Sequence, residues 1–303
     1  MRRARVSLGL VDPQRPLIVA PPADAARPEP EDVPAALAPV VDILSGATVA
    51  ALTGAGLSTD SGVPDYRSPG SPPRRPITLQ EFLAAETHRR HYWARNHLGW
   101  RFLRDVAPND GHRALALMEY EGTVNGVVTQ NIDLLHLKAG SRNVVHLHGR
   151  YDQVVCRDCG RTFSREAHDA ALTALNPGWR EKHVDDVEVA PDADAALEST
   201  ADFRVAPCPR CGGTLMPDVV FFGGTTPRDR VEHARSIVDE ADALLVAGSS
   251  LAVMSGLRFV RQAAKAGKPV VILTRGDTRG DDLATVKVEV STTLALPHLA
   301  QAL

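Results

Sequence analysis

The four cysteines of this chain fall into two CxxC pairs, Cys156 with Cys159 and Cys208 with Cys211. Thiolates bind zinc tetrahedrally at about 2.3 Å, and the two-residue spacing lets one turn present two sulfurs to the same ion. Free cysteines and two disulfides are alternatives, but paired spacing without an export signal favours a metal. Because four thiolates would leave no open position for water, we predict a structural zinc site.

A second candidate for chemistry is the segment VHLHG, which places His146 and His148 two residues apart. In an extended segment, residues at this spacing face the same side. A neutral imidazole accepts a proton near pH 7 because its ordinary pKa is about 6.5. The residues alone do not choose between these histidines, and a lone histidine is more often structural.

Short apolar segments alternate with amphipathic ones along the chain. Strands are expected over 48–53, 126–129, 143–146, 218–222, 243–247 and 269–273, and helices over 34–44, 79–104, 112–121 and 256–266. Short, continuously apolar strands alternating with helices predict the α/β class, with a doubly wound parallel sheet covered on both faces.

Small and hydrogen-bonding residues follow several of these strands. In parallel sheets, ligands lie beyond the carboxyl ends of the strands. Glycines there let backbone N–H groups approach a phosphate, and a following helix N-terminus favours negative charge. A dinucleotide site is therefore expected, although each loop alone is as well explained as a turn. The loops are 54–58 (GAGLS), 130–133 (QNID), 248–250 (GSS) and 274–276 (TRG).

The first of these loops departs from a common fingerprint. Gly54, Gly56 and Gly62 give GxGxxxxxG, whereas hydride-transfer enzymes generally have GxGxxG. The longer segment GAGLSTDSGVPDYR, residues 54–67, resembles the cofactor-loop signature of the sirtuin family position for position.

Further sirtuin-like motifs follow in the order of that family, so that the resemblance extends from about residue 48 to 296. They are TQNID at 129–133, the pair His148–Gly149 and GSSL at 248–251. The segments YWARN at 92–96 and KAGS at 138–141 are most similar to the class II, mitochondrial-type branch.

The resemblance implies a doubly wound, Rossmann-like domain and an NAD-dependent protein-lysine deacylase acting on acylated-lysine proteins or peptides. The acyl oxygen would attack the nicotinamide ribose, nicotinamide would leave, and the ribose 2′-hydroxyl would lose its proton toward His148. Gln130, Asn131 and Asp133, the other implied catalytic residues, would hold the nicotinamide ribose and carboxamide. Implied NAD contacts are Gly54, Ala55, Gly56, Ser58, Asp65, Tyr66, Arg67, Gln130, Asn131, Ile132, Asp133, Gly248, Ser249, Ser250, Thr274, Arg275, Gly276 and Thr292.

On the acyl-substrate side, the implied residues are Tyr92, Arg95, Val220, Phe221, Phe222 and Gly223. Tyr92 and Arg95 are three apart on an expected helix and share a face. We hypothesise that the Arg95 guanidinium binds a carboxylate at the acyl tip. The alternative places Tyr92 in the core and Arg95 in solvent. Two positions depart from the family: Thr274 stands where Asn is usual, and Gly224 where an acidic residue is usual.

Composition and spacing suggest the organisation of the chain. We expect a flexible arm over 1–34, an NAD-binding domain over 35–152 and 214–303 with a helical insertion at about 74–123, and a zinc module over 153–213. Within the zinc module, the cysteine pairs are separated by an insertion at 176–200. The net charge of -3 offers no broad basic field for nucleic acid, and no apolar stretch approaches the roughly 20 residues of a membrane span. A cytoplasmic monomer is expected.

Three other functions are compatible with parts of this pattern. Mono-ADP-ribosyl transfer to protein shares the first chemical event with deacylation. A non-catalytic zinc-ribbon module on a nucleotide-sensing scaffold would have the same cysteine pairs and the same nucleotide-binding loops. A redox dehydrogenase fits worst, because the glycine spacing of the first loop is wrong for it.

Overall fold

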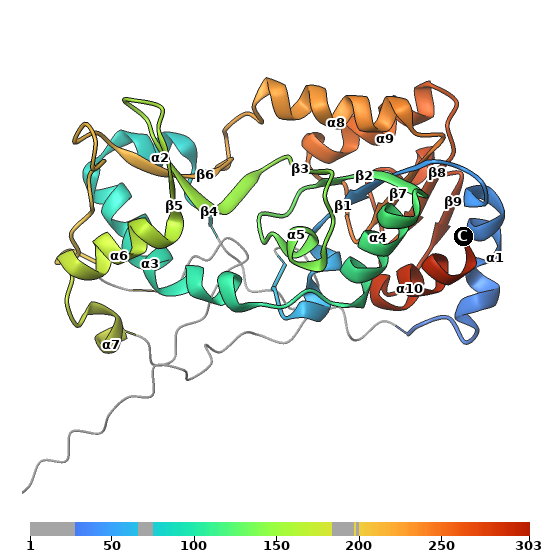
Figure 1. Cartoon of the computed structure of the whole chain (residues 1–303), viewed down its shortest axis with the longest axis horizontal. Helices are drawn as coiled ribbons and strands as arrows, with labels where there is room; N and C mark the ends of the chain where they lie inside the picture. Colours follow the sequence, from blue (N-terminus) through green and yellow to red (C-terminus); the bar gives the residue numbers. More distant parts are fainter. Residues whose placement is uncertain (1–27, 66–74, 184–196, 198–199) are drawn as a thin grey trace, which may run out of the picture.

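The computed structural model describes residues 28–65, 75–183, 197 and 200–303. The larger part of the molecule, on the right in Figure 1, is built on a parallel sheet of six strands. The strands lie in the order β3-β2-β1-β7-β8-β9, and every neighbouring pair is parallel. Their bounds are β1 (Val49–Thr53), β2 (Val124–Thr129), β3 (Val144–His146), β7 (Ala243–Ala247), β8 (Val270–Leu273) and β9 (Val286–Val288). The prediction of a doubly wound α/β fold is confirmed.

Helices cover both faces of this sheet, because alternate strand residues point to opposite sides. Ala51 and Leu245 face the helices α1 (Val33–Leu44), α4 (Asp110–Glu121) and α10 (Thr292–Ala302). Leu52 and Val246 face α8 (Arg228–Glu240) and α9 (Met254–Lys265) on the other side. Figure 1 shows these two layers, with the short helix α5 (Leu135–Ala139) beside α4.

A smaller antiparallel sheet, in the order β5-β4-β6, forms the second part of the molecule. It contains β4 (Gly149–Cys156), β5 (Thr162–Ser164) and β6 (Leu215–Val219). Around it lie α2 (Leu79–Ala84), α3 (Glu86–Asp105), α6 (Arg165–Leu175) and α7 (Trp179–His183). Phe82 and Trp93 from α2 and α3 share a core with Val154 of β4 and Leu172 of α6.

An ionic cluster lies buried between α3 and α6. The Asp169 carboxylate accepts a hydrogen bond from Arg101 at 2.7 Å and pairs with His97 Nδ1 at 2.5 Å. The fully buried Arg165 lies 3.8 Å from the same carboxylate, with its guanidinium over the rings of Trp93 and Trp100. Burial acts to raise the pKa of Asp169, but the His97 and Arg101 hydrogen bonds outweigh it and hold the pKa below its usual range.

Several expected elements differ from those observed. The helix expected over 79–104 is two helices, because a capping box on Thr78 and Glu81 starts α2 and the extended backbone of Ala85 separates it from α3. The strand expected over 218–222 lies earlier, over Leu215–Val219, because its partner β4 pairs there. Helices α5, α6, α7, α8 and α10 and strands β4, β5 and β9 were not anticipated. The expected arm lies largely outside the described residues, as does much of the insertion at 176–200.

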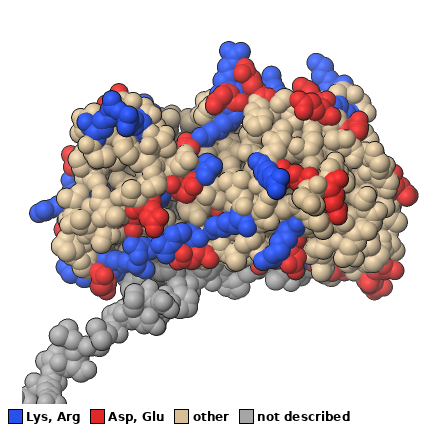
Figure 2. Space-filling view, in the orientation of Figure 1, with Lys and Arg blue, Asp and Glu red and all other residues tan. Residues whose placement is uncertain are grey.

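Charges of both signs are interspersed over the face in Figure 2. Among the described helices, none is both long and apolar enough to cross a lipid bilayer.

Candidate active site

A cavity of about 510 Å³ lies beyond the carboxyl ends of β1, β2, β7 and β8. Ligands of open parallel sheets bind at this position, where the chain crosses from one half of the sheet to the other. Most residues implied by the family resemblance line it. They are Ala55, Gly56, Ser58, Asp65, Tyr92, Gln130, Asn131, Ile132, Asp133, His148, Val220, Phe221, Phe222, Gly223, Gly248, Ser249, Ser250, Thr274, Arg275 and Gly276.

A few implied residues lie elsewhere. Gly54 and Arg95 are not among the described residues that line the cavity. Thr292 lines a small adjoining crevice, which also touches Gly56 and Arg275. Tyr66 and Arg67 lie outside the described residues.

The glycines of the first loop are needed because two strand ends meet there backbone to backbone. Gly56 N–H donates to the carbonyl of Gly248 at 2.8 Å. A Cβ on Gly54 would lie 2.8 Å from the Cβ of Ser249, and one on Gly56 would lie 2.9 Å from the Gly248 oxygen. Gly54 thus shapes the cavity by permitting this approach. Two 3₁₀ turns follow β1.

A hydrogen-bonded network of polar side chains forms the cavity wall next to β2. Asn131 Nδ2 donates to Gly54 O at 2.9 Å and to Ser58 Oγ at 3.0 Å. Ser58 Oγ in turn donates to Asp133 at 2.7 Å. Burial raises the pKa of Asp133, although hydrogen bonds from Leu135 N–H and Ser58 oppose the change. These contacts fix the side chains that face the cavity.

The structure distinguishes the two histidines that the sequence could not separate. His148 lines the cavity, whereas His146 is buried at the end of β3 and does not. The expectation that both face the same side is wrong, because the chain turns at residues 147–148 to leave the large sheet and enter β4. Gly149 makes this turn with φ of +91°, and a Cβ there would lie 1.9 Å from the Asp218 oxygen. The glycine after His148 therefore has a structural cause.

The His148 ring is held through a contact that sequence reasoning missed. Its Nε2 lies 2.7 Å from the Oγ of Ser255, in the first turn of α9. Burial lowers the pKa of His148, and a backbone hydrogen bond with Gln130 partly opposes this. The imidazole is therefore neutral at pH 7, as a proton acceptor must be.

At the end of β8, Thr274, Arg275 and Gly276 form the opposite wall of the cavity. The Arg275 guanidinium forms an ion pair with Glu29, whose other oxygen accepts from Ser291 N–H at 2.9 Å. Glu29 belongs to the region expected to be a flexible arm, and no sequence signal linked it to this site.

On the acyl-substrate side, Tyr92 and Phe221 line the cavity and pack edge to face, with ring centroids 5.3 Å apart. Phe222 is 45% exposed. Arg95 Nη1 lies 3.1 Å from His91 Nε2, one helical turn earlier. The two residues of the expected Tyr-x-x-Arg pair are thus placed differently relative to the cavity.

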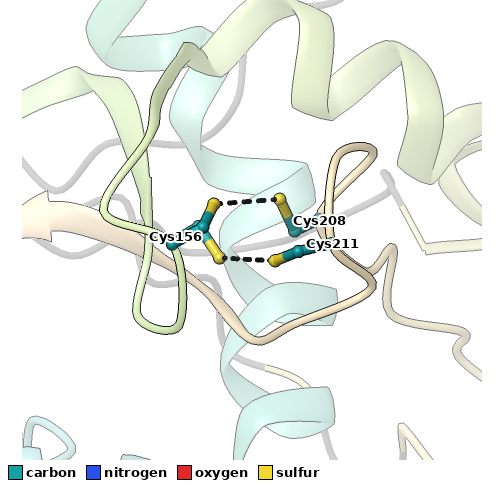
Figure 3. Close-up of side chains that lie close together, drawn as sticks. Cys156, Cys208 and Cys211 are labelled. Carbon is teal, nitrogen blue, oxygen red and sulfur yellow. Dashed lines mark hydrogen bonds between the residues drawn. The ribbon is translucent and has the colours of Figure 1, made fainter.

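The four cysteines meet at the small sheet, as Figure 3 shows for Cys156, Cys208 and Cys211. Their ligand atoms all lie within 4.8 Å of one another. The Cys156–Cys211 and Cys159–Cys208 sulfur pairs are 3.6 and 3.9 Å apart. Sulfurs in a disulfide would be about 2.05 Å apart, whereas four sulfurs around one zinc at about 2.3 Å are about 3.8 Å apart. The geometry fits zinc, and the predicted four-cysteine zinc site is confirmed.

Comparison with known proteins identifies the family. The model of the Sir2 family matches residues 54–255. The chain is 55% identical to NAD-dependent protein deacetylase 1 of Mycobacterium avium (strain 104), over 87% of this chain and 94% of that protein. It is 47% identical to the NAD-dependent protein deacylase SIR4 of Monosiga brevicollis, over 77% of each.

Solved structures agree. A structure of Sir2 with a p53 peptide and NAD+ matches with a TM-score of 0.67 and 27% identity, over 88% of this chain and 97% of that one. A second, from work on sirtuin substrate affinity, matches with a TM-score of 0.70. The chain belongs to the Sir2 family. It is an NAD-dependent protein deacetylase, which confirms the predicted enzyme class and the use of NAD.

Proposed function

We propose that this enzyme deacylates lysine side chains with His148 as the general base, in a cavity where Gln130, Asn131 and Asp133 position the nicotinamide end of NAD. The observation that carries the proposal is the position of His148, whose half-buried imidazole lines the cavity together with all three polar residues. The loops 54–58, 248–250 and 274–276 would hold the phosphates and the adenosine. Bound NAD supplies the ribose hydroxyl whose proton His148 accepts.

Substitution of His148 tests the proposal. His148→Ala is expected to slow nicotinamide release from NAD and an acetyl-lysine peptide by about 10²–10⁴-fold, the usual size of general-base catalysis. The matched control is His146→Gln, two residues away but outside the cavity lining, which should keep the turnover of folded enzyme close to that of the wild type. Near-normal turnover by His148→Ala would overturn the assignment of the base.

For the acyl group, we propose a preference for uncharged chains over acidic ones. Support comes from the aromatic rings of Tyr92 and Phe221 at the cavity and from the contact of the Arg95 guanidinium with His91. The hypothesis that Arg95 binds an acyl carboxylate requires other N–H groups of this guanidinium, because Nη1 already contacts His91. The similarity to the SIR4 deacylase supports placing the chain in the class II, mitochondrial-type branch, which we also propose.

A panel of peptides separates these possibilities. Acetyl-, succinyl- and glutaryl-lysine peptides of one sequence are compared with the wild type and Arg95→Ala. We expect the acetyl peptide to react fastest and Arg95→Ala to change all three rates alike. A selective loss of the succinyl and glutaryl reactions in Arg95→Ala would instead support carboxylate binding by Arg95.

A further inference from the structure

Ser255, in the first turn of α9, contacts the Nε2 nitrogen of the His148 ring. Its Oγ lies 2.7 Å from His148 Nε2, and both residues line the 510 Å³ cavity. Ser255 is only 8% exposed, so its hydroxyl is placed by the fold rather than by solvent. None of the sequence motifs discussed above includes this residue.

Close packing brings the first turn of α9 to His148. Gly256, the next residue, lies so near Gln130 that a Cβ on it would be 2.9 Å from the Gln130 side-chain amide. The Gln130 side chain is itself fixed, since its Oε1 accepts a hydrogen bond from Ser249 at 2.6 Å. The turn that carries Ser255 thus packs against Gln130, and the backbone of Gln130 is hydrogen-bonded to His148.

The hydrogen-bonding capacity of the ring determines which group donates in the contact between Ser255 and His148. A neutral imidazole has one nitrogen that donates and one that accepts. His148 has a backbone hydrogen bond with Gln130 that acts to raise its pKa. A hydrogen bond has this effect on a histidine when the ring donates it to a carbonyl, so the ring donates to the Gln130 carbonyl. The other nitrogen then accepts, and a hydroxyl is both a donor and small enough to fill that role. Nε2 accordingly carries the lone pair.

We propose that Ser255 is a positioning residue for the catalytic base: its hydroxyl donates to His148 Nε2 and holds the ring in the tautomer that can accept a proton. The proposal rests on the role of His148 given above. In the free enzyme, Ser255 occupies the nitrogen that the substrate hydroxyl must reach, so that the imidazole is already oriented when the substrate takes that place.

A donor to Nε2 also stabilises the neutral ring, so its removal raises the pKa of His148. The other ionisable groups among the described cavity residues are the carboxyls of Asp65, Asp133 and Asp277, the Arg275 guanidinium and the Tyr92 phenol. The substitutions proposed below leave all of these in place. A change in the titration of the base can then be assigned to the lost hydroxyl.

The test compares Ser255→Thr with Ser255→Val, which have the same shape but differ in the hydroxyl. The dependence of kcat/KM on pH is measured for the full chain with NAD and an acetyl-lysine peptide. For Ser255→Val we expect the acid limb to move to higher pH by roughly half to one unit, the value of one hydrogen bond. At the plateau, kcat/KM should fall about tenfold, a part of the general-base effect, because the ring is no longer oriented before the substrate binds. Ser255→Thr should restore the acid limb of the wild type.

Thermal unfolding and Ser255→Ala keep the proposal testable if a β-branched residue does not fit. Ser255→Ala should shift the acid limb in the same direction as Ser255→Val while Tm stays near that of the wild type. Wild-type acid limbs and wild-type kcat/KM in both the Ala and Val variants would overturn the proposal, as would equal shifts in the Thr and Val variants.

The two proposals fail in different ways. If His148→Ala retains turnover, the base is wrongly assigned, and the proposal for Ser255 falls with it. If His148→Ala is inactive while the hydroxyl-free Ser255 variants titrate as the wild type does, only the positioning role is lost.

Discussion

The small zinc-binding part of the molecule and the cavity at the edge of the large sheet are built by contrasting means. The small part relies on strong, local attractions: four thiolates that converge on one point and a buried cluster around Asp169. Apart from the ion pair of Arg275 with Glu29, the cavity relies largely on absent side chains and on hydrogen bonds between uncharged groups, such as the approach of Gly56 to Gly248 and the contact of Asn131 with Ser58.

The difference shows where each region is vulnerable. A site held by charge and metal fails when one ligand is lost, because the remaining charges are left buried without compensation. A site shaped by close backbone contact fails when volume is added. The substitutions below probe one mode of failure at a time.

Loss of the zinc should have the largest effect. In zinc-finger peptides, structural zinc contributes about 10–16 kcal/mol of apparent binding free energy, which is also folding free energy. We expect Cys208→Ser, or treatment with a chelator, to abolish zinc binding and to unfold the small sheet with loss of turnover. Zinc content, far-UV circular dichroism and activity measure this, and adding back zinc but not magnesium should restore the chelated wild type. One bound zinc per chain in Cys208→Ser would contradict four-cysteine ligation.

Removal of the central carboxylate of the ionic cluster should come next. Asp169→Ala leaves the buried Arg165 without its counter-charge, and breaking such a pair costs about 3–5 kcal/mol. Asp110→Ala is the control, because Asp110 pairs with Arg113 at the exposed surface, where a pair is worth less than about 1 kcal/mol. Urea unfolding of the full chain gives both values. Equal losses would contradict the dependence of the small part on buried charge.

Added volume beside the base should have a somewhat smaller effect on stability. Gly149→Ala introduces a Cβ 1.9 Å from a backbone oxygen at a positive φ, and we expect a loss of about 2–4 kcal/mol with reduced turnover. Gly46→Ala is the matched control, since Gly46 also has a positive φ (+72°) but has nothing within 4 Å of its Cβ position. It should cost about 1 kcal/mol and leave turnover unchanged. Similar losses in both variants would assign the effect to φ alone.

The effect that is smallest at neutral pH concerns the protonation of a buried histidine. Burial lowers the pKa of His146 to about 4. Between pH 6.5 and 4 the unfolded chain therefore binds a proton that the folded chain does not, so this contribution to stability is complete above pH 6.5 and is lost as pH falls through that range. His146→Gln should reduce the slope of unfolding free energy against pH by about 1.4 kcal/mol per unit. Exposed His233→Gln is the control, and an unchanged slope in His146→Gln would refute the prediction.

The features that could be predicted from the sequence are those set by residues close together along the chain. The zinc ligands were identifiable because each CxxC pair acts within one turn, and strands such as β1 and β7 because each is apolar almost throughout its length. The fold class followed from the alternation of such strands with helices. These features depend on neighbours along the chain. Strands β4, β5 and β9, which contain polar residues, were not predicted.

Features that depend on contacts between residues far apart in the sequence were missed or left open. The contact of Ser255 with His148 joins residues 107 apart, and that of Glu29 with Arg275 joins residues 246 apart. The choice between His146 and His148 depended on where the chain leaves one sheet for the other. The contact of Arg95 with His91, by contrast, spans one helical turn and could have been predicted from spacing alone.

The strand order has a consequence for how the protein folds. β1 pairs with β7, so that Val49–Thr53 must wait for Ala243–Ala247, nearly two hundred residues later, before both of its edges are hydrogen-bonded. On the ribosome, β1 and β2 emerge early and leave one apolar edge open, which is prone to pairing with other chains. Such long-range pairing also slows folding, since a long loop must close first. The whole small sheet lies within that loop, so its zinc can bind before the central sheet is complete.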